Sequence, residues 1–375
     1  RHKMTAQTDA SNNALLDFSG LPRFEAIKPE DVQPAISLLL ASNRALVERL
    51  TSDAAPATWN TFAAPLSDEI ERLSRAWGIV GHLHSVNDVP EWREAYNGML
   101  PEVSRFFAEL GQNLKLFARY KAIRESAEYA TLTQAQRKIV DNEIRDFRLS
   151  GAELHEDQKP RFQAISEELA SLSAKFSENL LDATNAFAQF VTDEGELAGI
   201  PDDVRQAARE AAEKEGQPGW KFTLHMPSYL PVMQYAESRD LRAAMYRAYA
   251  TRAAEFGPTE LDNTPLIRRI LELRREESQM LGYDNYAEVS LVPKMAESVP
   301  QVLAFLRDLA VKAKPFAHKD IAELREFAKQ ELGLDTLEPW DVGFASEKLL
   351  QARYAFSEQE VKRYFTEDKV LGGLF

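Results

Sequence analysis

A long amphipathic segment, Gln134–Thr192, constrains the fold of this chain more than any other feature. In its second half, apolar residues recur every three or four positions, at Phe162, Ile165, Leu169, Leu172, Phe176, Leu180, Ala183, Phe187 and Val191. This spacing places them on one face of a helix. A helix over residues 162–191 is on the order of 40 Å long. Several other helices must therefore lie along it to cover its apolar face.

The first half of the same segment predicts a shorter helix over Gln134–Phe147. Leu149-Ser150-Gly151 follows it, and glycine suits the left-handed position that comes after a helix C-terminus. The two helices together predict a central helical hairpin.

Further amphipathic patterns surround this hairpin in the sequence. Before it, helices are predicted over about 29–50, 59–86 and 90–123, with an interruption of the third at Pro101. After it, another long helix is predicted over 299–332, which Pro315 should kink or divide.

One stretch alternates in the manner of a strand instead. Its apolar residues are Trp220, Phe222, Leu224 and Met226, separated by polar ones. Since a lone strand is not stable, a β-hairpin is expected near 220–230.

These patterns predict a mainly α fold, a multi-helical domain with long antiparallel helices and a small β-hairpin. The predicted organisation is a disordered or expression-derived N-terminus at 1–14, a helical domain at 15–192 with the central hairpin, an insertion at 193–236 with a loop, a short helix and the β-hairpin, and a continuing helical region at 237–375. The apolar ending, Val370–Phe375, indicates a sequence cut from a larger protein.

Composition narrows the class of protein. The net charge is −14, and the basic residues form no patch or tail, which argues against a nucleic-acid partner. No apolar run approaches the length of a membrane helix, and no secretory signal is visible. Cysteine is absent, which excludes disulfides, thiolate nucleophiles and cysteine-ligated zinc. A cytoplasmic location is predicted.

The histidines supply no metal site by their spacing. His155-Glu156 begins like the zinc-peptidase motif His-Glu-x-x-His, but Lys159 stands where the second histidine must be. His82 and His84 are two residues apart, so on a helix they point in different directions. No nucleophile elbow or phosphate loop occurs either. No catalytic residue and no metal ligand is therefore assigned in this chain.

One cluster of aromatic and basic residues allows two interpretations. Tyr246 and Tyr249 lie in sequence among Arg242, Arg247 and Arg252, and the five could line a peptide groove. Alternatively the tyrosines belong to the core and the arginines to the surface, which is the favoured interpretation. The sequence alone assigns no substrate-binding residues.

Seven blocks of sequence, in this order, resemble a known family. They are Leu21-Pro22 with Ile27-Lys28-Pro29-Glu30, RDFRLSGAEL (145–154), FSENLLDATNAF (176–187), MPSYLPVMQYA (226–236), MYRAYATRA (245–253), LGYDNYAEVSLVPKMAE (281–297) and PWDVGFASEK (339–348). The chain from Leu15 to Phe375 resembles the N-terminal portion of the thimet oligopeptidase and neurolysin family of zinc metallopeptidases. The resemblance departs at Gly343-Phe344-Ala345, where relatives carry a more aromatic run.

The resemblance implies a mostly helical fold split by a deep channel, of which this half forms one wall. It also implies a parent enzyme that is a monomer, binds zinc and hydrolyses short oligopeptides, including signal-peptide fragments. The family's His-Glu-x-x-His helix and its other catalytic groups lie beyond the position that Phe375 resembles. The segment is therefore expected to be inactive alone, to bind no zinc itself, and to have short peptides and the C-terminal catalytic half as partners. The alternative is a self-sufficient helical peptide-binding module without catalytic activity.

Overall fold

The structure is a computed structural model that describes residues 13–52, 54–87, 89–355 and 357–375. Most of these residues are helical, and the strands form one small antiparallel sheet, so the prediction of a mainly α fold is confirmed. The chain divides into two compact units. Unit 1 comprises the residues up to 174 together with 268–299, and unit 2 comprises 175–267 together with 300–375. Residues 1–12 of the segment expected to be disordered lie outside the described residues.

All the regular secondary structure of unit 1 within its described residues is helical. Its elements are η2 (Ala14–Leu16), η3 (Phe24–Ala26), α1 (Pro29–Ser52), η4 (Trp59–Ala63), α2 (Ala64–Val86), α3 (Pro90–Gly111), α4 (Leu114–Glu125), α5 (Glu128–Thr131), α6 (Gln134–Leu149) and α12 (Tyr286–Leu291). The boundaries between the two units fall within α7 (Lys159–Ala186), within α11 (Thr264–Met280) and directly after Val299.

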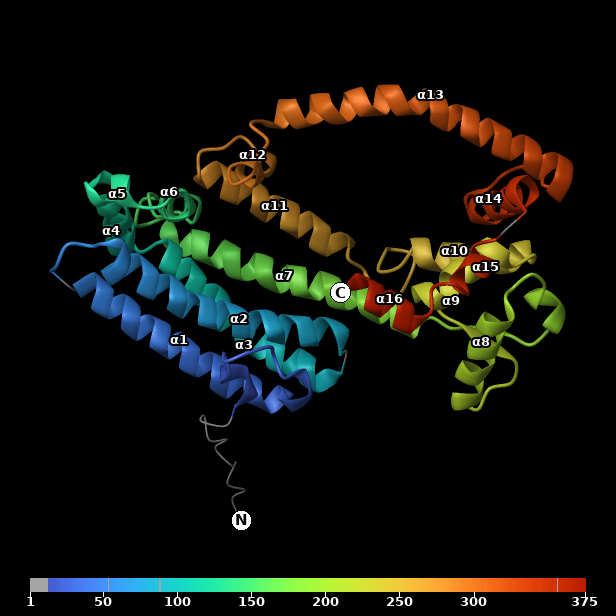
Figure 1. The fold of residues 1–375 in the computed structure, drawn as a ribbon, viewed down its shortest axis with the longest axis horizontal. Coiled ribbons are helices and arrows are strands. Elements are labelled where there is room, and N and C mark those ends of the chain that lie inside the picture. The colour runs from blue at the N-terminus through green and yellow to red at the C-terminus, as the bar shows by residue number, and fades with distance from the viewer. Residues whose placement is uncertain (1–12, 53, 88, 356) are drawn as a thin grey trace, which may run out of the picture. The chain divides into compact units, whose positions relative to one another are not determined.

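The helices α1, α2 and α3 lie side by side (Figure 1). Their apolar faces form a core that includes Ile36, Leu73, Val80 and Trp92, all buried. This core follows directly from the helical spacing of apolar residues in the sequence. A second core in unit 1 lies mainly between α4 and α6, where Ile123, Val140 and Phe147 are buried.

The predicted interruption at Pro101 is wrong. The helix α3 passes through Pro101 and ends at Gly111, and Asn113 then begins α4. The Asn113 side chain accepts hydrogen bonds from the amides of Lys115 and Leu116, so it caps the new helix. The chain therefore changes direction at a capping asparagine instead of at the proline.

The two helices of the central segment are present, but the second is shorter than predicted. After α6, Gly151 has a φ of +85°, and the amide of Ala152 donates to the carbonyl oxygen of Phe147, which confirms the predicted left-handed helix end. The helix α7 ends at Ala186, not near Val191, because Gln189–Val191 leaves the helix to form strand β1.

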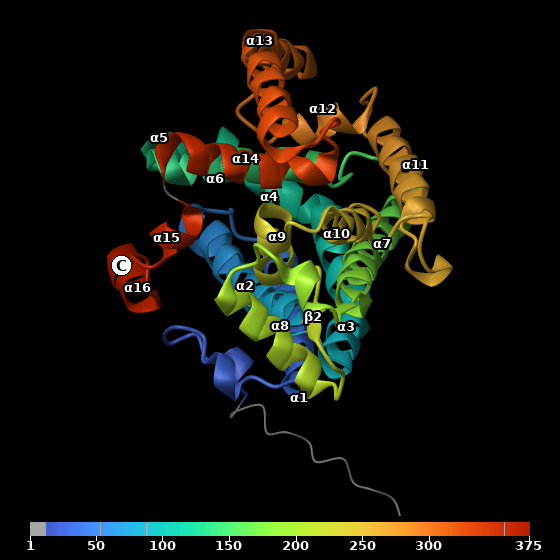
Figure 2. The ribbon, with the colours of Figure 1, turned by 90° about the vertical axis from the view of Figure 1, so that its right-hand side faces the viewer.

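Unit 2 combines helices with the small sheet. Its elements are β1 (Gln189–Val191), η5 (Glu194–Leu197), α8 (Asp202–Lys214), β2 (Trp220–Phe222), α9 (Met226–Tyr235), α10 (Arg239–Ala250), η6 (Thr259–Leu261), α13 (Val299–Leu332), α14 (Pro339–Tyr354), α15 (Glu358–Lys362) and α16 (Glu367–Leu374). Its main core joins residues of β1, α8, β2, α9 and α10. Figure 2 shows β2 beside α8.

The sheet confirms a strand at Trp220 but corrects its length. The strand β2 ends at Phe222, and Met226 is already the first residue of α9, whose second residue is Pro227. Its antiparallel partner is β1, with Val191 opposite Trp220. The two strands are separated in sequence by α8, so they are not joined by a tight turn. Leu224 is buried as the alternation predicts, although it lies outside the strand.

The helix α13 runs over Val299–Leu332, the range that its sequence predicts. It continues through Pro315 without a break and is curved (Figure 1). Every residue from 303 to 320 is exposed, and these include large apolar side chains.

Two glycines in the turn before β2 provide a test of this sheet. Gly216 and Gly219 both have a positive φ, but only at Gly219 would a Cβ atom approach the backbone, at 2.1 Å from the carbonyl oxygen of Val191. We expect Gly216→Ala to reduce the free energy of unfolding by about 1 kcal/mol, the cost of a left-handed alanine. We expect Gly219→Ala to reduce it by roughly 3 kcal/mol, because β1 must also move. Urea unfolding measures both, and equal losses would contradict the predicted clash.

Candidate functional site

The aromatic and basic cluster predicted from the sequence lies on and just after α10. Ser238 caps this helix, since its hydroxyl oxygen accepts from the amide of Leu241. Successive turns of α10 then present Arg242, Tyr246 and Tyr249 to the core of unit 2. The structure thus gathers these residues in one region, but it gives the three arginines very different surroundings.

Arg242 is not a surface arginine, which corrects the favoured interpretation for this residue. Only 1% of it is exposed, and its Nη2 donates to Oδ1 of the fully buried Asp341 at 2.7 Å. Its remaining donors bond the carbonyl oxygens of Ala236, Glu237 and Trp340. With these contacts Arg242 fixes α10 to the start of α14, and none of its charge is available to a ligand.

Asp341 is the acceptor at the centre of this arrangement. Oxygen Oδ2 receives a hydrogen bond from Nη2 of Arg239 at 2.7 Å and another from the amide of Glu338 at 3.0 Å. Burial alone raises the pKa of Asp341, but the hydrogen bonds from Arg239 and Arg242 outweigh it and hold the pKa below its ordinary value of 3.8. The carboxylate is therefore charged at neutral pH and balances Arg242.

The two tyrosines pack as the favoured interpretation expects. The ring of Tyr249 stacks on that of Tyr229, with centroids 4.3 Å apart, and Tyr246 contacts Trp340 at 6.0 Å. All four rings belong to the core of unit 2 or pack against it. Arg247, by contrast, is exposed on the outer side of α10.

Arg252 occupies a third kind of environment, just beyond the end of α10. Its guanidinium carbon lies 3.7 Å from the centroid of the Tyr249 ring. Its Nε donates to the carbonyl oxygen of Tyr249, and its Nη1 donates to Oγ1 of Thr184, each at 3.0 Å. The side chain is half-buried and lines a cavity of about 280 Å³. Neither interpretation of the sequence predicted this cavity, because its walls come from distant segments.

The histidines are dispersed. His82 and His84 lie on α2, where His84 stacks on Tyr96 with ring centroids 4.3 Å apart. Nδ1 of His155 lies 2.7 Å from Asp157, and His225 is exposed before α9. Within the described ranges, no three histidine, aspartate or glutamate side chains gather as a metal site would require.

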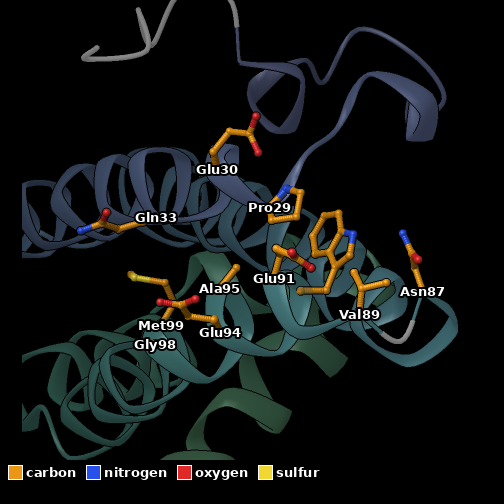
Figure 3. Close-up of a pocket in the computed structure, with 11 residues that line it drawn as sticks. Pro29, Glu30, Gln33, Asn87, Val89, Glu91, Glu94, Ala95, Gly98 and Met99 are labelled. Carbon is orange, nitrogen blue, oxygen red and sulfur yellow. The ribbon is translucent and has the colours of Figure 1, made fainter. Parts of the chain in front are cut away.

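A depression in unit 1 lies where α1 and α3 begin. It has a volume of about 870 Å³, and the side chains of Glu30, Glu91 and Glu94 lie around it (Figure 3). Glu91 and Glu94 are exposed to solvent, and the buried Trp92 forms part of the lining. These glutamates do not form a metal-binding group.

The comparisons with known proteins identify the class to which this chain belongs. Residues 36–159 match the family model of the neurolysin and thimet oligopeptidase N-terminal domain, and residues 232–375 match the model of peptidase family M3. The chain belongs to peptidase family M3, which confirms the resemblance noted in its sequence.

The relatives define the match more closely. Over 365 residues the chain is 45% identical to oligopeptidase A of Salmonella typhimurium, and this alignment covers 97% of the chain and 54% of that protein. It is 44% identical over 366 residues to oligopeptidase A of Haemophilus influenzae, with the same two shares. A probable cytosolic oligopeptidase A of Arabidopsis thaliana is 39% identical over 383 residues, covering 99% of the chain and 54% of the relative. The chain thus spans about half the length of the curated relatives it matches.

Among the residues that the structure describes, no helix has both the length and the apolar character needed to cross a membrane.

The buried ion pair gives a prediction with a defined pH dependence. Asp341→Asn leaves Arg242 buried without a compensating charge, so we expect the free energy of unfolding at pH 7 to fall by about 3–5 kcal/mol. Since the pKa of Asp341 is lowered by folding, the native pair contributes fully above the ordinary pKa of 3.8, and its contribution is lost as the pH falls below it. The difference between the two proteins should therefore shrink between about pH 5 and pH 2.

Urea unfolding at several pH values measures this difference. Asp308→Asn is the matched control, because Asp308 pairs with Lys312 on exposed α13 and its loss should change stability little. A difference that stays constant down to pH 2 would contradict the role assigned to Asp341.

Proposed function

We propose that this chain is the N-terminal part of a cytoplasmic zinc metallo-endopeptidase that hydrolyses short oligopeptides, including signal-peptide fragments. The proposal rests on the similarity to oligopeptidase A, which extends over 97% of the chain. In this proposal the chain forms one wall of the substrate channel, and the whole enzyme is a monomer. Long helices packed along one another suit such a wall, because they are rigid enough to admit extended peptides and exclude folded proteins.

The residues that the structure describes offer no set of ligands for zinc. The sequence contains no His-Glu-x-x-His motif, and the described residues form no metal-binding group. We therefore assign no catalytic step to any residue here. The proposed contributions of the chain are to hold the peptide and to support a catalytic half that belongs to the same polypeptide.

The exposed helix α13 supports a partner of this kind. Phe305, Val311 and Phe316 are 62%, 72% and 71% exposed, and Leu306 and Leu309 also face solvent. Apolar surface of this extent on one helix marks an interaction site. The occupant we propose is the catalytic half, since the match covers only 54% of the relative's length.

Activity measurements test the proposed function. We expect the complete reading frame that contains these residues to cleave short peptides, and a chelator to abolish the cleavage. The chain of 375 residues should cleave nothing under the same conditions. Zinc-dependent hydrolysis by the chain alone, or a stop codon directly after Phe375, would overturn the proposal. The stop codon would favour the self-sufficient peptide-binding module.

A substitution on α13 tests the proposed partner separately. Phe316→Ser should lower the free energy of unfolding of the complete protein by about 2 kcal/mol, because a buried phenylalanine is lost. In the 375-residue chain, where Phe316 is exposed, it should change stability little. Lys319→Ser, on the same exposed stretch, is the control and should be neutral in both. Equal effects of Phe316→Ser in the two proteins would show that the catalytic half does not cover this face.

A further inference from the structure

The cavity beside Arg252 is lined by apolar groups on nearly every side. Its walls come from the end of α7, from α10, from Leu224 and from the loop between α10 and α11, and include Ala183, Phe187, Ala248 and Leu261. At about 280 Å³ it lies near the lower limit of small-molecule pockets. It can accept one or two small residues, but not a long peptide.

The guanidinium of Arg252 is the one charged group among the residues that line this cavity. A guanidinium has five N–H donors, and the structure uses two of them, one to Tyr249 and one to Thr184. One face of the group is covered by the Tyr249 ring, so the remaining donors lie along its edge. No ion pair joins Arg252 to any carboxylate of the described residues. This differs from Arg242, whose charge Asp341 balances.

The loop that carries Arg252 is held firmly to α7. Asn263 is 3% exposed. Its backbone N–H donates a hydrogen bond to the carbonyl oxygen of Ala253, and its side-chain Nδ2 donates one to the carbonyl oxygen of Phe176. Asn179, 1% exposed, donates in turn to Oδ1 of Asn263. These bonds hold Ala253 at a φ of +48°, a conformation that costs a non-glycine residue about 1 kcal/mol or more. The position of Arg252 is therefore fixed before any ligand arrives, which reduces the entropy cost of binding.

From this arrangement we propose that the Arg252 cavity binds a peptide carboxylate together with a small apolar group next to it. The planar edge of a guanidinium matches a carboxylate, and the apolar wall accepts a methyl-sized side chain. The carboxylate can be the C-terminal group of a peptide or the side chain of an acidic residue. This binding goes beyond the proposed peptidase function and does not depend on it, because it requires only residues of this chain and no hydrolysis.

Calorimetric titration of the 375-residue chain with three dipeptide probes tests the proposal. N-acetyl-Ala-Ala carries a terminal carboxylate, its C-terminal amide carries none, and N-acetyl-Ala-Glu-amide carries only a side-chain carboxylate. We expect one or both acids to bind and the amide to bind at least about tenfold more weakly. The acid that binds more tightly identifies the source of the carboxylate. Equal binding of all three probes, or binding of none, overturns the proposal.

Variants locate the binding at this cavity. Arg252→Gln should weaken the binding of the acid at least about tenfold, whereas Arg247→Gln, on the exposed side of α10, should leave it within about twofold. Ala183→Leu fills the cavity and retains Arg252, so it should also abolish binding. Ala244→Leu, at an exposed position of α10, is its control.

Ala183→Leu and its control Ala244→Leu keep the test decisive if circular dichroism shows that Arg252→Gln does not fold. Undiminished binding by Ala183→Leu would show that the carboxylate binds elsewhere and would overturn the proposal. These titrations measure binding and no cleavage. A negative result therefore says nothing about the peptidase activity of the complete protein, which the cleavage assay tests separately.

Discussion

The buried ion pair between Arg242 and Asp341 holds unit 2 together. This unit is built from two stretches of chain, 175–267 and 300–375, that unit 1 residues separate in the sequence. The pair joins α10 of the first stretch to α14 of the second, and neither side chain is more than 1% exposed. Removing two charges from water is costly, so such a pair is tolerated only when every donor and acceptor is satisfied. The carbonyl oxygens around Arg242, and Arg239 beside Asp341, meet that condition.

The two ends of α10 show how one residue type can serve opposite purposes. Arg242 is neutralised by an aspartate and is unavailable to any ligand. Arg252, ten positions later, rests on an aromatic ring and keeps its positive charge. Neutral partners such as Tyr249 and Thr184 orient a guanidinium without cancelling its field. That no carboxylate of the described residues forms an ion pair with Arg252 is therefore the more informative property when the two arginines are compared as candidate binding groups.

Helical spacing predicted much of the fold, because one apolar face per helix is a local property of the sequence. It located α13 at both ends and the helix end at Gly151. It did not distinguish Pro101, which α3 accommodates, from Asn113, whose side chain caps α4. The helical spacing also predicted that α7 continues past Ala186, because Phe187 and Val191 fit the helical period. In the structure Val191 instead pairs with β2. Strand pairing is a contact between distant residues, and the period of one segment does not contain it.

The candidate site was harder to predict for the same reason. The sequence placed Tyr246, Tyr249 and the arginines close together, but it could not show which arginine meets Asp341, 99 residues away from Arg242. Nor could it show that α7 and the loop after α10 enclose a cavity. Family resemblance identified the class of protein, since that information is spread over many blocks of sequence. The burial of one arginine and the openness of another depend on tertiary packing alone.

The exposed apolar side chains of α13 have a consequence for how copies of this chain behave in solution. The chain carries a net charge of −14 at neutral pH, so two copies repel one another before their α13 helices can meet. Salt shortens the range of this repulsion to about 10 Å at 0.1 M, whereas it does not weaken the attraction between apolar surfaces. Near the isoelectric point of about 5.1 the repulsion vanishes. Ionic strength and pH therefore act as the controls on self-association of a chain whose long helix α13 is exposed at every residue from 303 to 320.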